Sequence, residues 1–387
     1  MPDALPPDAT SDLRAAGPPP PIAIRSSGEP EFCPGLEAAI ACAGRIERAT
    51  HGFHAYPAGM HADCAAAVIE MAPAGAIHDP FCGGGTVLVE AMLAGRNSSG
   101  TDLSPVALLT SRARTADPAL ATAMRSAARK LAAAAQLRTE TEVPEICQDW
   151  YEPHVAFEIG RLRDGIQEYD GAVKLLLNAV LSSIIVKASW RASDTSNRRQ
   201  PHQRAPGTTA ILFHKKAREL GRMMEDLPTG DDRPVCRLKM ADARRHGPPP
   251  GTSLILTSPP YPGVYDYVPM QQLRHAWLGM NADLGLAAEV GSRRSFRAQG
   301  RANALRVWRE DTNDWIRCQV DALSPGSHIA IVVGDGIVGG RTVDTLSPTI
   351  ESLRNAGTRI LGRASADRPD HAREAIRTEH IVLASRT

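Results

Sequence analysis

The chain has 387 residues, with 44 basic and 43 acidic side chains, so its formal net charge is only +1. This near balance excludes a uniformly basic surface for nucleic acid, and any such contact must be local. A composition of 43% hydrophobic and 22% charged residues is that of a globular protein long enough to bury a full core. We find no apolar run that could cross a bilayer and expect no membrane contact.

The cysteines and the N-terminal residues indicate the cellular compartment in which the protein is expected. Seven cysteines are scattered without a Cys-x-x-Cys pair, which predicts neither a metal site nor a disulfide framework and favours a reduced, cytoplasmic setting. Residues 1–34 are rich in proline and lack both an apolar segment and a basic start. We expect them to form a disordered tail and not a signal peptide.

Residues 35–118 are expected to form a helix and then a cofactor-binding half domain. A short strand over 76–81 leads into the glycine loop 82–86, and a helix follows over 87–93. Glycines at such a turn let a ligand approach the backbone and leave amide groups free to bind it. The next strand, 98–101, ends in Asp102, whose carboxylate suits the hydroxyls of a ribose. Leu88 stands where a dinucleotide fingerprint has its third glycine, so nicotinamide binding is the poorer interpretation.

Residues 119–235 are predicted to be a helical insertion that could contact the target. Apolar periodicity predicts helices in this region and just before it. Their expected ranges are 105–115, 120–137, 171–189 and 208–226, with a polar loop over 191–206 between the last two.

Residues 236–387 are predicted to complete the sheet as the catalytic half of the domain. The strand 238–241 ends in Asp242, which we expect to meet the cofactor's adenine amino group; Asp149 is the rival for that role. Further strands are expected over 253–256, 328–333, 359–363 and 380–384. The fold class is therefore a doubly wound α/β sheet with a helical insertion. Because ligands bind at the carboxyl ends of such strands, Asp79, Asp102, Asp242 and Ser258 should surround one site.

The segment Thr257-Ser258-Pro259-Pro260-Tyr261 carries the chemistry. The lone pair of a base amino group is delocalised into the ring, so two acceptors must draw it back onto the nitrogen. The Ser258 side chain and the Pro259 carbonyl, held rigid by the prolines, could accept its two hydrogens. Tyr261 could stack on a base swung out of its helix. An ordinary Pro-Pro turn is the alternative.

Two motifs resemble those of the amino-group DNA methyltransferases. The run from Asp79 to Thr86, Asp-Pro-Phe-Cys-Gly-Gly-Gly-Thr, is similar to their S-adenosylmethionine motif, with Gly84 in a Ser/Thr place. Ser258-Pro259-Pro260-Tyr261 resembles the catalytic motif of the cytosine N4 group. His51 to Ala58 resembles a His-x-Tyr-Pro-Ala-Lys element whose lysine is replaced by Gly59, and residues 334–338 and 377–383 resemble late strands of a bacterial subgroup.

The resemblance implies a class I, Rossmann-like methyltransferase that uses S-adenosyl-L-methionine and no metal. Its implied catalytic residues are Ser258, Pro259, Pro260 and Tyr261, and its implied cofactor-binding residues are Tyr56, Asp79, Pro80, Phe81, Gly83, Gly85, Thr86, Asp102, Leu103 and Asp242. The implied reaction is methylation of a flipped base in double-stranded DNA, with cytosine N4 favoured and a restriction endonuclease as a candidate partner.

Three other functions stay open. Adenine N6 methylation uses the same motif. Guanine N2 methylation of transfer RNA is performed by a family with a similar cofactor loop and an Asp-Pro-Pro-Tyr motif, in which an acid replaces Ser258. A DNA- or cofactor-binding protein without turnover is the least favoured. The cofactor motif precedes the catalytic motif, the reverse of the order in many cytosine N4 enzymes, so the target base is undecided, as is the oligomeric state.

Arginines concentrate in two segments that could contact nucleic acid through phosphates and base edges. The candidates are Arg191, Arg198, Arg199 and Arg204 in the first segment, and Arg293, Arg294 and Arg297 in the second. A solvated helix face is the alternative for both segments.

Overall fold

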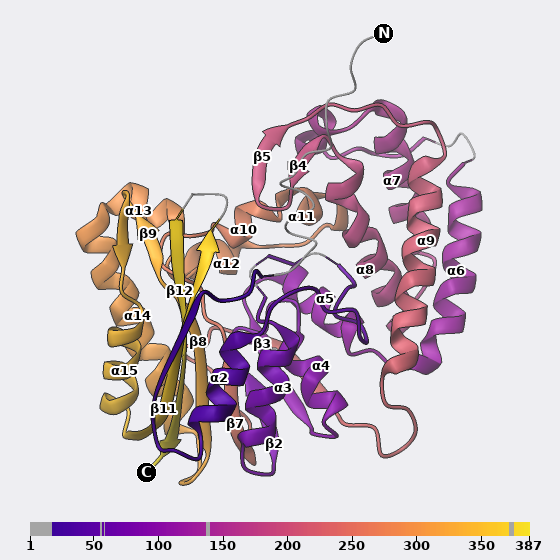
Figure 1. Ribbon diagram of the computed structural model, residues 1–387. Coiled ribbons are helices and arrows are strands. Elements are labelled where there is room, and N and C mark those ends of the chain that lie inside the picture. Colours follow the sequence, from indigo (N-terminus) through magenta and orange to yellow (C-terminus); the bar gives the residue numbers. More distant parts are fainter. Residues whose placement is uncertain (1–17, 55, 58, 137–139, 371–374) are drawn as a thin grey trace.

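The centre of the molecule is an eight-stranded sheet. The computed structural model describes residues 18–54, 56–57, 59–136, 140–370 and 375–387. The strand order is β1-β11-β12-β8-β7-β2-β3-β6 (Figure 1). The bounds are β1 Ala23–Gly28, β2 Ala76–Asp79, β3 Ser98–Asp102, β6 Cys236–Met240, β7 Thr252–Thr257, β8 His328–Gly334, β11 Thr358–Asp370 and β12 Ala375–Arg386. Strands β6, β3, β2, β7 and β8 are parallel, whereas β12, β11 and β1 are antiparallel to their neighbours.

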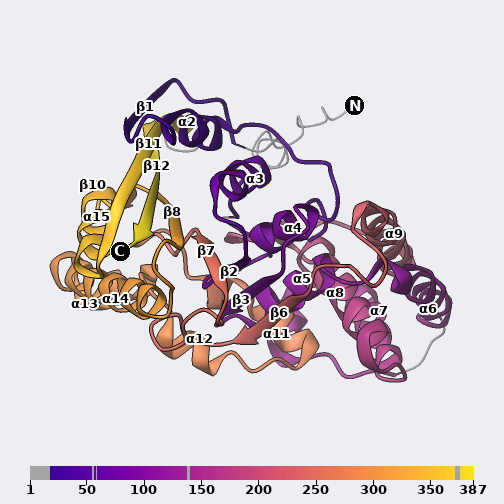
Figure 2. The same ribbon diagram turned by 90° about the horizontal axis from the view of Figure 1, so that it is seen from below.

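Helices cover both faces of this sheet (Figure 2). The helices α2 (Cys33–Ala41), α3 (Ala62–Met71) and α4 (Thr86–Leu93) share one apolar core with the sheet, and α14 (Arg301–Asp321) and α15 (Leu346–Asn355) share another. Successive residues of β7 alternate between the two cores: Leu254 and Leu256 belong to the first, and Ile255 to the second. This two-sided burial explains the continuous apolar run in the sequence. The doubly wound, Rossmann-like class I fold with a helical insertion is confirmed.

The predicted insertion is a helical block beside the sheet. It consists of α6 (Ala121–Ala134), α7 (Pro153–Ile166), α8 (Gly171–Ala188) and α9 (Thr208–Met223), and it packs on α5 (Pro105–Arg114). By length and composition α8 could cross a membrane, contrary to our expectation that no apolar run is long enough. The reason for its composition is that it packs against α5, α6, α7 and α9 in the middle of the block.

The predicted catalytic half reaches into this block through α11 (Gln272–Leu278). Leu273 and Trp277 of α11 are fully buried in the core of the block. The buried guanidinium of Arg274 donates from Nε to the Ser182 carbonyl of α8 at 2.9 Å. The helical block is therefore joined to the segment that follows the Ser258 motif.

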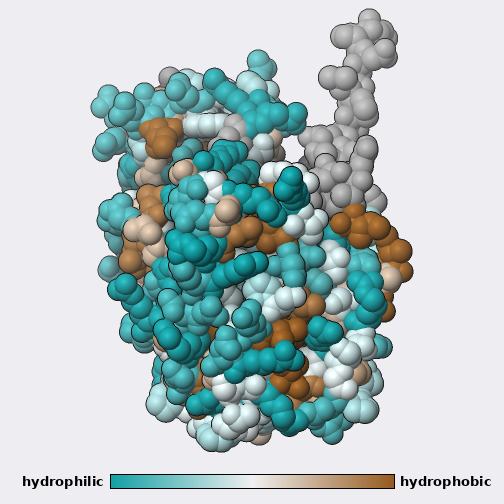
Figure 3. Space-filling view, turned by 90° about the vertical axis from the view of Figure 1, so that its left-hand side faces the viewer, coloured by the Kyte–Doolittle hydropathy of each residue, from teal (hydrophilic) through white to brown (hydrophobic). Residues whose placement is uncertain are grey.

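The remaining elements lie near the carboxyl ends of the parallel strands or at the side of the sheet. The predicted loop 191–206 contains the hairpin β4 (Arg191–Ser193) and β5 (Ser196–Arg199). Between β7 and β8 the chain forms α10 (Tyr267–Met270), α11, α12 (Asp283–Ala288), α13 (Arg293–Gln299) and α14, and after β8 comes the hairpin β9 (Gly336–Val338) and β10 (Arg341–Val343). The side of the molecule to which α14 and α15 contribute is mainly hydrophilic, with scattered apolar areas (Figure 3).

The prediction of a disordered tail over residues 1–34 is wrong for the residues that the structure describes. Residues 1–17 lie outside the described residues, but residues 23–28 form β1 at the sheet edge. β1 pairs with β11, and Arg25 forms an ion pair with Asp367 at 2.5 Å. Gly28 has φ of +138°, and a Cβ there would lie 2.4 Å from the Gly362 Cα, so glycine allows the close approach. Pairing with β11 thus orders a segment that has too few apolar residues to form a core by itself.

We expect Glu158→Ala to destabilise the helical block. The buried Glu158 carboxylate accepts hydrogen bonds from the first amides of α9: Gly207 N at 2.5 Å, Thr209 N at 3.0 Å and Ala210 N at 3.3 Å. Removing it leaves buried donors unpaired, at a cost of about 1–3 kcal/mol in the free energy of unfolding measured in urea. Glu225→Ala is the control, because that side chain is 61% exposed in its ion pair with Arg125. Equal losses in the two variants would contradict the capping role.

Candidate active site

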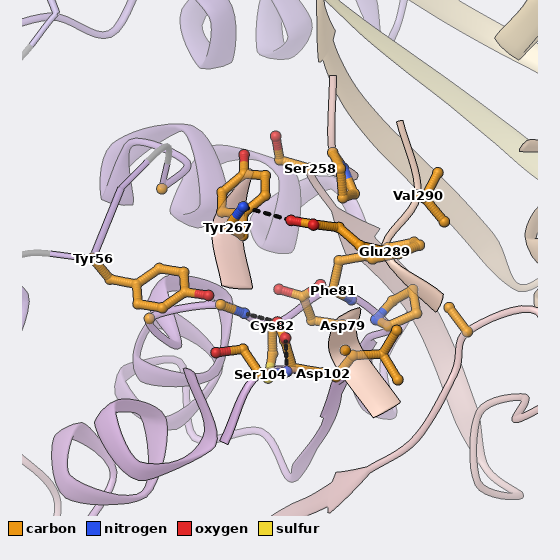
Figure 4. A pocket seen from close by; sticks show the side chains of 18 of the residues that line it. Tyr56, Asp79, Phe81, Cys82, Asp102, Ser104, Ser258, Tyr267, Glu289 and Val290 are labelled. Atoms are coloured by element: carbon orange, nitrogen blue, oxygen red, sulfur yellow. Dashed lines mark hydrogen bonds between the residues drawn. The ribbon is translucent and has the colours of Figure 1, made fainter. Parts of the chain in front are cut away.

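The four polar residues at the strand ends surround one cavity. Asp79, Asp102, Asp242 and Ser258 all line it, at the ends of β2, β3, β6 and β7. The cavity is partly open to solvent, so a small molecule could enter it. Its other predicted lining residues are Tyr56, Pro80, Phe81, Gly83, Thr86, Leu103 and Pro260. Tyr56 and Phe81 are labelled in Figure 4.

The Asp79 carboxyl joins the cofactor strand to the catalytic strand. Its Oδ1 accepts a hydrogen bond from Thr257 Oγ1 at 2.7 Å and another from Phe81 N at 3.1 Å. Burial raises the pKa of Asp79 to about 7, although both hydrogen bonds oppose the rise. A positive ligand in the cavity would therefore favour the ionised form.

The Asp102 carboxyl fixes the glycine loop. Oδ2 accepts from Gly83 N at 2.9 Å and Oδ1 from Ser104 N at 2.8 Å. Burial raises the pKa of Asp102 above its ordinary value, against the effect of these bonds. Gly85 is the predicted cofactor residue that does not line the cavity. Instead it precedes α4 with φ of +83°, the left-handed conformation that turns the loop into the helix.

A buried arginine explains why glycine occupies position 84. Arg114 donates from Nε to Phe53 O at 2.8 Å, from Nη1 to Gly84 O at 2.9 Å and from Nη2 to His54 O at 2.9 Å. A Cβ on Gly84 would lie 3.1 Å both from Arg114 Nη1 and from Tyr56 Cβ, so a Ser or Thr side chain has little room. Sequence analysis missed Arg114, because nothing local distinguishes it from a surface arginine.

The element around Tyr56 packs over the same loop. Tyr56 and Gly59 line the cavity, whereas Ala55 and Ala58 lie outside the described residues. A Cβ on Gly83 would lie 3.3 Å from the Tyr56 ring. Gly59 stands where the His-x-Tyr-Pro-Ala-Lys element has its lysine, so this position has no positive charge.

Asp242 lies at the cavity but is engaged in an ion-pair network. Arg244 Nη2 lies 2.7 Å from Asp242 Oδ2, and its Nη1 lies 2.5 Å from Asp311 Oδ1. Partial burial acts to raise the pKa of Asp242, but the hydrogen bonds and charge of Arg244 outweigh it and the pKa is lowered. The rival residue, Asp149, does not line the cavity. Of the two residues only Asp242 reaches the cavity, where Arg244 holds its carboxylate, and the adenine contact stays a prediction.

The predicted catalytic motif is divided between two spaces. Ser258 and Pro260 line the main cavity, whereas Pro259 and Tyr261 line a smaller neighbouring one. The Tyr261 ring lies under Arg377, with 5.1 Å from the guanidinium to the ring centre, and its hydroxyl is 3.3 Å from Ser258 Oγ. The stacking position that we expected for Tyr261 is therefore not the one it occupies. Tyr267 of α10 is an aromatic residue that lines the main cavity together with Ser258 (Figure 4).

Glu289, between α12 and α13, is an acidic lining residue that sequence analysis missed. Its Oε1 accepts from Tyr267 N at 2.5 Å, and burial raises its pKa to about 7. The described lining residues thus include four carboxyl groups and no Lys, Arg or His. Such a cavity disfavours the phosphates of a dinucleotide. It suits S-adenosyl-L-methionine, which carries a positive sulfonium and a positive ammonium group.

The predicted nucleic-acid arginines fall into two groups. Arg191 is buried and donates to Ser196 O and Met270 O, both at 2.7 Å, so its prediction as a nucleic-acid contact is corrected. The second segment also serves the fold: Arg293 Nη2 donates to Val264 O at 2.5 Å, and Arg294 lies beside Glu289. These guanidinium groups satisfy backbone carbonyls or a carboxylate of the loops around the cavity.

The other predicted arginines lie closer to solvent. Arg198 and Arg199 are exposed on the β5 strand, and the Arg199 guanidinium stacks on Trp190 at 4.6 Å. Arg204 Nη2 donates to the Lys187 carbonyl at 2.5 Å, and Arg297 is exposed on α13. These four residues remain able to meet a phosphate.

Gly85→Ala should disrupt the cofactor loop more than Gly95→Ala does. Both glycines have positive φ, so alanine is strained by about 1–2 kcal/mol at either site. Only at Gly85 would the Cβ also meet backbone, 3.0 Å from the Ser111 Cα, whereas nothing lies within 4 Å at Gly95. We expect thermal unfolding to show the larger loss for Gly85→Ala, and calorimetry to show weaker binding of S-adenosyl-L-methionine. Equal effects of the two substitutions would contradict this account.

Cofactor affinity should rise with pH through neutrality. With pKa values of about 7, Asp79 and Glu289 are mostly neutral at pH 6 and mostly ionised at pH 8. A cation binds better to the ionised carboxylates, so titration calorimetry should give a dissociation constant roughly tenfold lower at pH 8 per coupled group. Asp79→Asn should reduce the slope. A pH-independent affinity would show that neither carboxyl senses the ligand.

We compared the chain with protein-family models and with curated proteins. Residues 52–156 match the family model described as UPF0020: RMKL-like, methyltransferase domain, which is less than half of the chain. No curated protein matches the chain.

Several solved methyltransferase structures are similar to the chain at low identity. TrmN from Thermus thermophilus is 12% identical, with a TM-score of 0.31 over 84% of this chain and 49% of TrmN, so the chain spans about half its length. The rRNA methyltransferase aviRa from Streptomyces viridochromogenes is 13% identical, with a TM-score of 0.34 over 86% of this chain and 88% of aviRa. The glycopeptide N-methyltransferase MtfA complexed with (S)-adenosyl-L-methionine is 8% identical, with a TM-score of 0.32 over 84% and 87%.

Fold, cavity and family match lead to one conclusion at the level of the enzyme class. The protein is an S-adenosyl-L-methionine-dependent methyltransferase of class I fold, and its residues 52–156 match the model described as UPF0020: RMKL-like, methyltransferase domain.

Proposed function

We propose that the protein methylates an exocyclic amino group of a base in nucleic acid, with RNA as the first candidate substrate. The observation that carries the proposal is the position of Ser258 and Pro260. They stand at the end of β7 and line the same cavity as Asp79 and Asp102. An amino-group acceptor motif and the cofactor carboxylates therefore border one space.

The residues around Ser258 have different roles in the proposed methyl transfer. The Ser258 hydroxyl accepts a hydrogen bond from one amino hydrogen, and we assign the second to the backbone carbonyl of Pro259, although Pro259 lines the neighbouring space. The two bonds return the lone pair to the nitrogen. The Tyr261 hydroxyl, 3.3 Å from Ser258 Oγ, orients the serine from outside the main cavity. Tyr267 provides the aromatic wall for the base. S-adenosyl-L-methionine supplies the activated methyl group, so the protein mainly positions the amino group and excludes water.

The choice of RNA rests on the family match. The family whose model matches residues 52–156 consists mostly of RNA methylases, including guanine N2 methylases of tRNA. The second candidate is double-stranded DNA, methylated at cytosine N4 or adenine N6, because Ser258-Pro259-Pro260-Tyr261 has the form of the cytosine N4 motif. A restriction endonuclease would be a partner only under this second candidate.

The β4–β5 hairpin is the element that we assign to the nucleic acid backbone. Arg191 ties the hairpin to Met270 at the end of α10, and Tyr267 at the start of α10 lines the cavity. The exposed Arg198 and Arg199 are therefore carried by an element anchored next to the cavity wall. Positive side chains in this place would bind phosphates whatever the sequence.

Ser258→Ala should lower methyl transfer by roughly 100-fold, because one of the two amino-group acceptors is lost. The measurement is mass spectrometry of nucleosides from the RNA and DNA of cells that express either form. Ser126→Ala is the control, since Ser126 is exposed on α6 and does not line the cavity.

The product decides the substrate. N2-methylguanine in RNA that disappears with Ser258→Ala would support the first candidate, and N4-methylcytosine or N6-methyladenine in DNA the second. Unchanged methylation by the Ser258→Ala protein would contradict the mechanism.

A further inference from the structure

Glu289 is a carboxyl group that none of the sequence motifs contains. It follows α12 and precedes α13, and its side chain is 5% exposed. It lines the cavity together with Asp79 and Ser258. The Glu289 and Asp79 carboxyl groups point into the same space from different elements (Figure 4).

Only one oxygen of this carboxyl accepts a hydrogen bond from the described residues. Oε1 accepts hydrogen bonds from two backbone amides of α10, Tyr267 N at 2.5 Å and Val268 N at 3.4 Å. Oε2 is buried and has no hydrogen-bond partner among the described residues, although Arg294 Nη2 lies 3.3 Å away. An unsatisfied buried carboxylate oxygen is costly, and a ligand that brings compensating charge would offset the cost.

The charges around Glu289 leave the cavity negative. Arg294 from α13 is the near cation, and its side chain is 36% exposed and therefore partly screened by solvent. Asp266 before α10 and Asp79 of β2 add negative charge, and burial raises the pKa of Glu289 to about 7. A cation entering the cavity would meet an incompletely neutralised carboxylate.

We propose that Glu289 makes the cavity select the positively charged methyl donor over its uncharged thioether product. S-adenosyl-L-methionine and S-adenosylhomocysteine differ by one methyl group and one positive charge. The ammonium group is common to both compounds, so the difference lies at the sulfur. A buried carboxylate attracts the sulfonium and gains nothing from the neutral thioether. The inference rests on the proposed function only in that methyl transfer removes this charge. Selection by Glu289 would then favour exchange of spent for fresh cofactor after each turnover.

The test is calorimetric titration of the full-length protein with each compound at pH 8, without nucleic acid. Glu289→Gln keeps an acceptor for the Tyr267 amide and removes the charge. We expect roughly tenfold weaker binding of S-adenosyl-L-methionine, with the affinity for S-adenosylhomocysteine changed less than twofold, as for loss of one charge contact. Glu310→Gln is the control, because Glu310 is 57% exposed in its ion pair with Arg306 and does not line the cavity.

Two outcomes would overturn the proposal. Equal weakening of both ligands would mean that Glu289 only supports α10 or contacts a part common to both compounds, and no change in either would mean that it does not sense the ligand. If the variant fails to fold, the Asp79→Asn protein provides the test, because Asp79 and Glu289 share a pKa of about 7 and only Glu289 then remains to titrate in that range. Its preference for the charged ligand should still grow between pH 6 and pH 8, and a constant preference would reject the idea. Because no substrate is used, failure here is separate from failure of the RNA assignment.

Discussion

The hydrogen bond from Thr257 to Asp79 is the contact on which the geometry of the active site depends. It joins the end of β7 to the end of β2, so the residue just before Ser258 is fixed to the first residue of the cofactor motif. The Asp102 carboxylate extends the connection to β3 by accepting from Gly83 N. A short polar chain across three neighbouring strands therefore sets the distance between the two chemical halves of the site.

The sequence was a good guide wherever the signal is local. The glycine loop, the strands that end in Asp102 and Asp242, and the convergence of these ends with Ser258 follow from residues close together in the chain. The helix α7 and the strand β1 were missed, because their order comes from packing and pairing with distant segments. Arg114 and Glu289 were missed for the same reason: their roles depend on partners 30 to 61 and 21 to 22 residues away, respectively.

The arginines show where residue type alone is ambiguous. Arg191 and Arg198 lie in one hairpin, yet the first is buried among backbone carbonyls and the second is exposed. A guanidinium group with five donors serves equally well as an internal support or as a phosphate ligand. Tyr261 and Tyr267 present the same ambiguity, since only the course of the chain after Pro260 decides which ring enters the cavity.

The packing of α11 into the helical block limits how this enzyme could be re-engineered. Leu273 and Trp277 belong to the core of the block although they come from the catalytic half of the chain. Deleting residues 119–235, or exchanging them for the insertion of a relative, would expose both side chains and release the chain that leads from the Ser258 loop. To change the target by exchanging the insertion, one would therefore have to exchange α11 together with residues 119–235. The two segments are distant in sequence but pack as one unit.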